Sequence, residues 1–137
     1  MSSTFDDARI TSFQPKQEKD TENKEVLTKL LFKGEAKLNN TLQISELFAG
    51  FRKRLIKVKF SPYDDYDNDI SFDNASIEDF TVKNRMERVG QGKEAERIPV
   101  EYVFFTMAVK MDVEGNFLKD MYSIFQRTVK MDIEFIE

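Results

Sequence analysis

The sequence of 137 residues contains no cysteine, no histidine and no tryptophan. Without cysteine, the chain can form neither a disulfide nor a thiolate metal site. Without histidine, it lacks the usual general base and the commonest metal ligand. Carboxylate or lysine chemistry stays open, but no pair stands out among the 25 acids. We therefore predict a protein that is not an enzyme, with no catalytic residues, no metal site and no cofactor.

Long apolar runs are also missing. No stretch approaches the roughly 18 apolar residues that suggest a membrane-spanning helix. The first residues are polar and acidic, which is not the pattern of a signal peptide. A chain of this length fits one domain with one core. We expect a cytoplasmic protein with no membrane contact.

Alternation of apolar and polar residues is the main structural signal, and it is typical of half-buried antiparallel strands. It predicts strands at 26–38, 56–60, 70–72 and 77–86. The segment 98–136 is predicted as two further strands that reverse direction at 114–116. An alternative stays open there, because the apolar spacing within 117–125 also suits a short helix.

A stripe of apolar residues at helical spacing predicts one amphipathic helix at about 42–54. Packing this helix on the strands gives an α+β fold in which it covers a curved antiparallel sheet of about five strands. Such a sheet forms a small barrel, and its architecture is similar to that of an oligonucleotide-binding barrel. The predicted domain spans 26–137.

Residues 1–25 are polar and have the composition of a disordered arm. Their few large apolar residues, Phe5, Ile10 and Phe13, are predicted to dock on the chain's own domain or on a neighbouring subunit. The arm is therefore a candidate oligomer contact.

A basic segment with aromatic neighbours is the strongest candidate binding site. Basic groups neutralise phosphates, and aromatic rings stack on unpaired bases. On a strand, Lys57 and Lys59 project from the same side. The simpler interpretation is that these cations cover a solvated helix end and strand face. The predicted nucleic-acid-binding residues are Arg52, Lys53, Arg54, Lys57, Lys59, Tyr63 and Tyr66, and Arg85, Arg88, Lys93 and Arg97 are predicted to extend the surface.

An acidic loop at 61–69 follows the basic segment. Asp65, Asp67 and Asp69 have the first spacings of an EF-hand loop. Position six is Ile70 instead of glycine, and position twelve is Ser76 instead of glutamate. We therefore predict no calcium site, and interpret the loop as solvated, as paired with the basic segment, or as facing a basic partner.

Two functional hypotheses follow from the sequence. The first is a non-enzymatic accessory protein that binds single-stranded nucleic acid through the basic and aromatic surface. The alternative is a protein–protein interaction module, an assembly subunit or inhibitor that uses the N-terminal arm and the acidic loop. Deleting residues 1–25 would separate them, because it would remove only the second activity.

Overall fold

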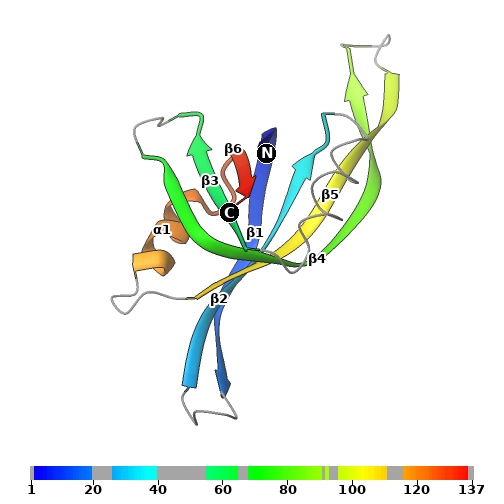
Figure 1. Ribbon diagram of the computed structural model, residues 1–137. Helices are drawn as coiled ribbons and strands as arrows, with labels where there is room; N and C mark the ends of the chain where they lie inside the picture. Colours follow the sequence, from blue (N-terminus) through cyan, green and yellow to red (C-terminus); the bar gives the residue numbers. More distant parts are fainter. Residues whose placement is uncertain are drawn as a thin grey trace.

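Six antiparallel strands and one helix make up the described part of the chain. The computed structural model describes residues 2–19, 26–39, 55–64, 68–90, 92, 96–110 and 116–135. The strands close into a barrel in the order β1-β2-β5-β4-β3-β6 (Figure 1). Their bounds are β1 Ser2–Lys19, β2 Val26–Lys37, β3 Leu55–Pro62, β4 Ile70–Val89, β5 Glu96–Lys110 and β6 Val129–Phe135, and α1 spans Asn116–Ile124. The prediction of a small α+β barrel with a helix packed on it is confirmed.

Phenylalanines fill the barrel because alternate residues of each strand point inward. The rings of Phe32, Phe60 and Phe72 are fully buried and lie 5.8–6.3 Å apart between centroids. The helix adds Phe117, whose ring meets Phe72 edge to face at 4.9 Å. Met121 of the helix is completely buried in the same core. Phenylalanine rings thus fill the space between the helix and the barrel.

Gly34 lies on β2, between β1 and β5. It pairs with Ile10 of β1 and with Phe105 of β5. A Cβ atom at Gly34 would stand 2.6 Å from the Phe105 ring and 2.7 Å from the backbone oxygen of Arg9. Glycine is required here because any side chain would displace backbone.

The N-terminal segment differs most from its prediction. Instead of a polar arm, it forms the long strand β1, which pairs with β2 on one side and β6 on the other. This strand raises the count from about five to six and closes the barrel. Composition misled the prediction because most residues of β1 face solvent, and only widely spaced side chains such as Phe5, Ala8 and Ile10 enter the core.

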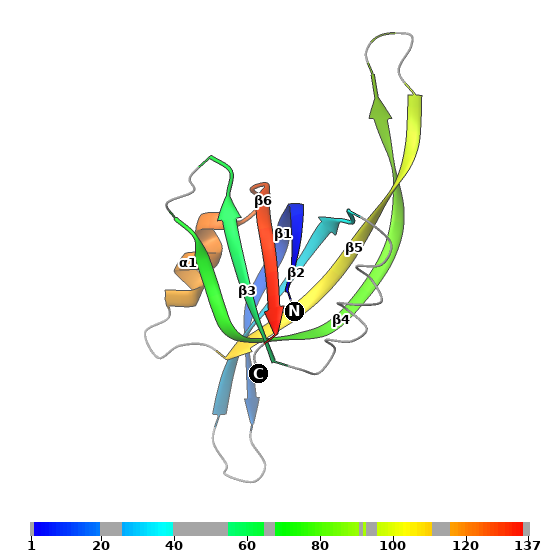
Figure 2. The ribbon, with the colours of Figure 1, turned by 45° about the horizontal axis from the view of Figure 1, so that its top comes forward.

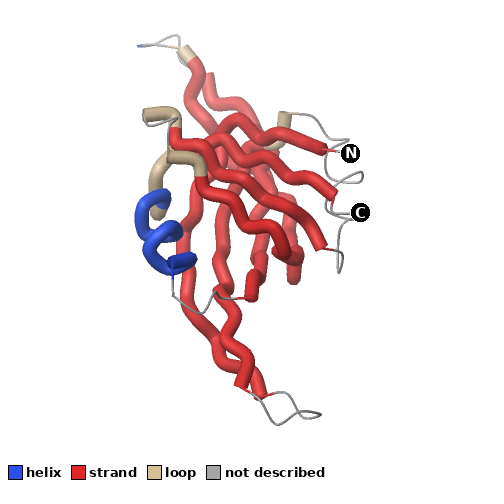
Figure 3. Tube along the Cα trace, turned by 60° about the vertical axis from the view of Figure 1, so that its left-hand side comes forward, coloured by secondary structure: helices blue, strands red, loops and turns tan. Residues whose placement is uncertain are grey.

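The predicted C-terminal hairpin is wrong, and the strand–helix–strand alternative is confirmed. Strand-favouring residues such as Tyr122 and Ile124 belong to α1. Their propensity is overridden because Phe117, Met121 and Ile124 recur at helical spacing and reach the core together. Figure 3 shows the helix lying against the barrel.

Two other predictions concern the middle of the chain. The strands predicted at 70–72 and 77–86 are parts of one strand, β4, which continues through a register shift between Ile77 and Asp79. The helix predicted at 42–54 lies outside the described residues.

Two strand pairs continue past the barrel, at opposite ends of the molecule (Figures 1 and 3). At one end, residues 17–19 of β1 pair only with 26–28 of β2. At the other, residues 84–89 of β4 pair with 96–101 of β5, and no further described strand pairs with either. We call this second extension the β4–β5 ribbon.

A basic wall and a paired wall on the barrel

The outward side chains of β1, β2, β5 and β4 form a surface that we call the basic wall. Residues directly opposite in a ladder point to the same side, so the register and the buried alternate residues define this surface. Its described cations are Arg9, Lys16, Lys29, Lys33, Lys37, Lys83, Arg85 and Lys110, and its described acids are Asp6, Asp7, Glu35, Glu78, Asp79, Glu87 and Glu96. Eight cations and seven acids lie there, so the wall is slightly positive although the whole chain carries a net charge of −4.

Three lysines form a row across the basic wall. Lys29 of β2 lies directly opposite Lys16 of β1 on one side and Lys110 of β5 on the other. Neighbouring strands are about 4.8 Å apart, so the three stems start close together. The row therefore concentrates positive charge at one place on the wall.

An arginine–aromatic cluster occupies the wall further along the strands. Arg85 donates two hydrogen bonds to Glu35, at 2.6 and 3.3 Å. Its guanidinium lies 4.6 Å from the ring centroid of Tyr102 and 5.7 Å from that of Phe104. The bond to Glu35 raises the already high pKa of Arg85. Arg85 is therefore held flat on the wall and stays charged.

Tyr102 links this cluster to a second ion pair. Its hydroxyl donates to Glu87, which also lies 3.5 Å from the ammonium group of Lys37. Burial, together with the bond to Glu87, raises the pKa of Tyr102 to about 12. The same hydroxyl lowers the pKa of Glu87. Tyr102 thus remains a neutral donor throughout the physiological range.

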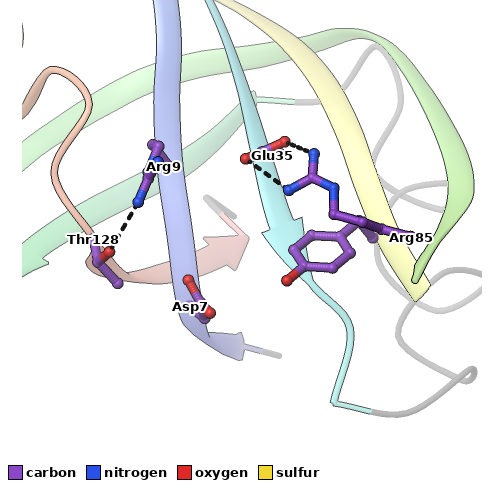
Figure 4. A pocket seen from close by; sticks show the side chains of 6 residues that line it. Asp7, Arg9, Glu35, Arg85 and Thr128 are labelled. Atoms are coloured by element: carbon purple, nitrogen blue, oxygen red, sulfur yellow. Dashed lines mark hydrogen bonds and ion pairs between the residues drawn. The ribbon is translucent and has the colours of Figure 1, made fainter. Parts of the chain in front are cut away.

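A small polar pocket of about 160 Å³ opens beside this cluster (Figure 4). Asp7, Arg9, Glu35, Arg85, Tyr102 and Thr128 line it. The guanidinium of Arg9 donates to the hydroxyl of Thr128 at 3.5 Å. Opposite charges on its walls balance, and no nucleophile stands beside a base among its lining residues. The pocket offers polar contacts of both signs.

The opposite side of the barrel, built on β3 and β6, is the paired wall. Lys57 faces Glu134 and Lys59 faces Asp132 across the ladder. Lys59 also pairs with Asp69 at 3.2 Å, which lowers the pKa of that carboxyl. The described charges of this wall are Lys57, Lys59, Lys130, Asp69, Asp73, Asp132 and Glu134. Acids slightly outnumber cations, so this wall attracts a polyanion weakly.

The predicted nucleic-acid-binding residues divide between this paired wall and undescribed parts of the chain. Lys57 and Lys59 do share one face, but on the paired wall, among carboxylates. Tyr63 is exposed, and its hydroxyl donates to the backbone oxygen of Asp6. Arg52, Lys53, Arg54 and Tyr66 lie outside the described residues.

The arginines predicted to extend that surface lie elsewhere. Arg85 belongs to the basic wall, while Arg88 and Arg97 lie on the β4–β5 ribbon, away from β3 (Figure 2). Lys93 is not among the described residues. The structure therefore does not gather the described members of the predicted surface into one patch.

The predicted contact residues of the arm belong mainly to the core. Phe5 and Ile10 are completely buried inside the barrel. Phe13 is half-buried, with its ring edge to face with those of Tyr122 and Phe125 at 4.8 and 5.3 Å. Docking on the chain's own domain is the arrangement observed, and Phe5 and Ile10 offer no surface to a neighbouring subunit.

Sequence reasoning missed the lysine row. Lys16, Lys29 and Lys110 are isolated in sequence, and each alone resembles an ordinary solvated side chain. Only the pairing of β2 with both β1 and β5 brings them together. The alternation in β2, with Lys29, Lys33 and Lys37 on one face, was the available signal.

Two further properties bear on function. Across the described ranges, no helix is long and apolar enough to span a membrane. Nor do three acidic side chains of these ranges come together in a group able to hold a metal ion. Comparisons of the chain with protein-family models, curated protein sequences and solved structures find no match.

Proposed function

We propose that this protein is a non-enzymatic nucleic-acid-binding protein whose basic wall holds the phosphate backbone of a single strand. The row Lys16–Lys29–Lys110 carries the proposal. The stems of these three lysines start on neighbouring strands, so the row concentrates positive charge on one face of the sheet. A nucleic acid supplies closely spaced phosphates, and their neutralisation releases counterions.

The shape of the wall favours a flexible strand over a duplex. The basic wall is the outer surface of a small closed barrel, so it is convex. Duplex DNA is stiff over about 150 base pairs and would touch such a surface over a short length. A single strand bends easily and can follow the lysines along β2. Lys29 and Lys33 are four residues apart, about 13 Å, or roughly two phosphate repeats.

Base recognition contributes little on this surface. Tyr102 is buried, and Arg85 already covers the rings of Tyr102 and Phe104. Stacking on unpaired bases needs an accessible ring face. The expected behaviour is therefore sequence-tolerant binding that weakens steeply with salt.

Two matched charge reversals test the proposal. The double substitution Lys16→Glu with Lys110→Glu reverses the charge at the two exposed ends of the lysine row. Lys57→Glu with Lys59→Glu makes the same charge change on the paired wall. Binding of a fluorescent oligo-dT is measured for both variants and the unaltered protein across a salt series, beside duplex DNA, with circular dichroism to confirm folding.

The first variant should bind on the order of 30-fold more weakly, and its slope of log affinity against log salt should be shallower by about 1.4, because two phosphate contacts are lost. The second variant should change binding by less than about threefold, since its lysines are already paired with acids. Equal losses in the two variants, or no binding by the unaltered protein at low salt, would contradict the proposal.

A further inference from the structure

The β4–β5 ribbon exposes apolar side chains that the fold itself leaves uncovered. Met86, Val89 and Ile98 are 57%, 50% and 40% exposed. They make up half of the six large hydrophobic side chains that are exposed among the described residues. Concentration of exposed apolar side chains on one projecting element marks an interaction surface.

One side of this ribbon combines apolar residues with carboxylates. Glu87 lies directly opposite Ile98, and Val89 lies directly opposite Glu96. These four residues therefore share one side of the two-stranded ladder. We call this side the acidic face.

The other side combines apolar residues with arginines. Met86 lies opposite Pro99, and Arg88 lies opposite Arg97. A hydrogen bond at 3.0 Å from Arg88 to the backbone oxygen of Gly92 orients its guanidinium. No ion pair joins Arg97 to any residue that the structure describes. We call this side the basic face.

The two faces match each other in chemistry. Within 86–89 and 96–99, each presents two apolar residues, Val89 and Ile98 or Met86 and Pro99, beside two charges of a single sign. Nearer the barrel, Arg85 lies on the side of the acidic face and Glu101 on the side of the basic face. We propose that the ribbon is a self-association site, in which the basic face of one copy packs on the acidic face of the next. The contact buries apolar surface and places arginines against Glu96, beside Glu87, which already binds Tyr102 and Lys37. Both effects favour association.

A second copy fits the ribbon better than a nucleic acid does. Arg88 and Arg97 are balanced by Glu96 and Glu101 of the same ribbon. The described ribbon therefore has no row of neighbouring lysines like the one on the basic wall. Packing unlike faces is a heterologous contact, which produces a ring if the rotation closes and a filament if it does not.

Charge exchange between two variants tests the contact directly. Arg88→Glu with Arg97→Glu makes both faces acidic, and Glu96→Arg removes the acidic character of the other face. The mass of each variant, of the unaltered protein and of an equimolar mixture of the two variants is measured by light scattering without nucleic acid. The wall variant with Lys16→Glu and Lys110→Glu is the matched control.

The unaltered protein and the wall control should have a mass that is a multiple of 16.1 kDa. Each ribbon variant alone should dissociate at concentrations about tenfold higher than the unaltered protein. The mixture should regain the assembled mass, because the acidic faces of the Arg88→Glu, Arg97→Glu variant can then pack on the basic faces of the Glu96→Arg variant. Recovery on mixing distinguishes a specific face-to-face contact from a general loss of folding.

Two results would overturn the inference. One is a monomeric unaltered protein at every concentration studied. The other is a mixture that stays as dissociated as its components. If the ribbon variants lose oligo-dT binding with no change in mass, the ribbon belongs to the nucleic-acid site, and self-association is rejected. The proposed function can fail without affecting this outcome, because the mass is measured in the absence of nucleic acid.

Discussion

The basic wall and the paired wall use the same residue type in opposite ways. On the paired wall, Lys57 and Lys59 each stand between carboxylates of neighbouring strands. On the basic wall, Lys29 stands between two further lysines. Both walls are antiparallel ladders of one barrel, so the difference comes from which residues the strand pairing places opposite each lysine. A lysine on a strand is therefore interpretable only once its cross-strand neighbours are known.

The largest effect is expected from disturbing the register that builds the basic wall. Gly34→Val places a side chain where Phe105 and the Arg9 backbone leave no room. Overpacking at this point should destabilise the barrel by about 3 kcal/mol. Urea unfolding measures the change. Ser71→Ala, an exposed change on β4 beside the paired wall, is the control and should stay within about 0.5 kcal/mol. A value for Gly34→Val as small as the control's would show that the strands adjust freely.

The second prediction concerns a variant in which the paired wall should behave like the basic wall. Asp132→Asn with Glu134→Gln removes the carboxylates opposite Lys59 and Lys57 while keeping the shape of both side chains. Affinity for oligo-dT should rise about tenfold, with a steeper dependence on salt, because two negative charges beside Lys57 and Lys59 are removed. An unchanged affinity would mean that something other than charge balance distinguishes the walls.

A pH effect should distinguish the arginine–aromatic cluster from the rest of the basic wall. The pKa of Tyr102 rises from 10.0 to about 12 on folding. The folded state therefore holds this proton more tightly than the unfolded state does. The stabilisation is complete below pH 10 and is lost as pH rises towards 12. Tyr102→Phe should flatten the stability curve in that window, whereas Tyr122→Phe, at an exposed position, should leave it unchanged.

The smallest effect concerns stability and has opposite signs on the two walls. Lys16→Glu replaces a repulsive pair with an attractive one opposite Lys29, and should stabilise the fold by about 0.5 kcal/mol. Lys57→Glu places two carboxylates opposite each other and should destabilise it by a similar amount. Thermal unfolding of the two variants measures the difference. Effects of the same sign would contradict the register-based distinction.

The barrel was largely predictable because apolar alternation survives in β2, β3 and β5. Phe32, Phe60 and Phe105 could be assigned to the core from sequence. The first strand, β1, was not predicted because few of its residues are large and apolar and its outward residues are polar. The sequence could not distinguish a helix at 116–124 from a hairpin strand, because both patterns fit the same apolar residues. The packing of Phe117 on Phe72 shows the helix.

The candidate surface was less predictable than the fold. A contiguous basic segment drew attention to Lys57 and Lys59, whose partners Asp132 and Glu134 come from the far end of the chain. The lysine row joins residues that are 13 and 81 positions apart. Local sequence patterns cannot contain this information, because it depends on which strands become neighbours.

The seam between β1 and β6 has a consequence for the order of folding. Ser3 pairs with Ile133 and Phe5 with Met131, so the barrel closes through contacts between segments more than a hundred residues apart. Contacts of such sequence separation slow folding, because the chain loses loop entropy before they form. During synthesis, the barrel cannot close until β6 has left the ribosome and can pair with β1. Removing residues 1–25 would therefore open the barrel, and that deletion cannot report on partner binding alone.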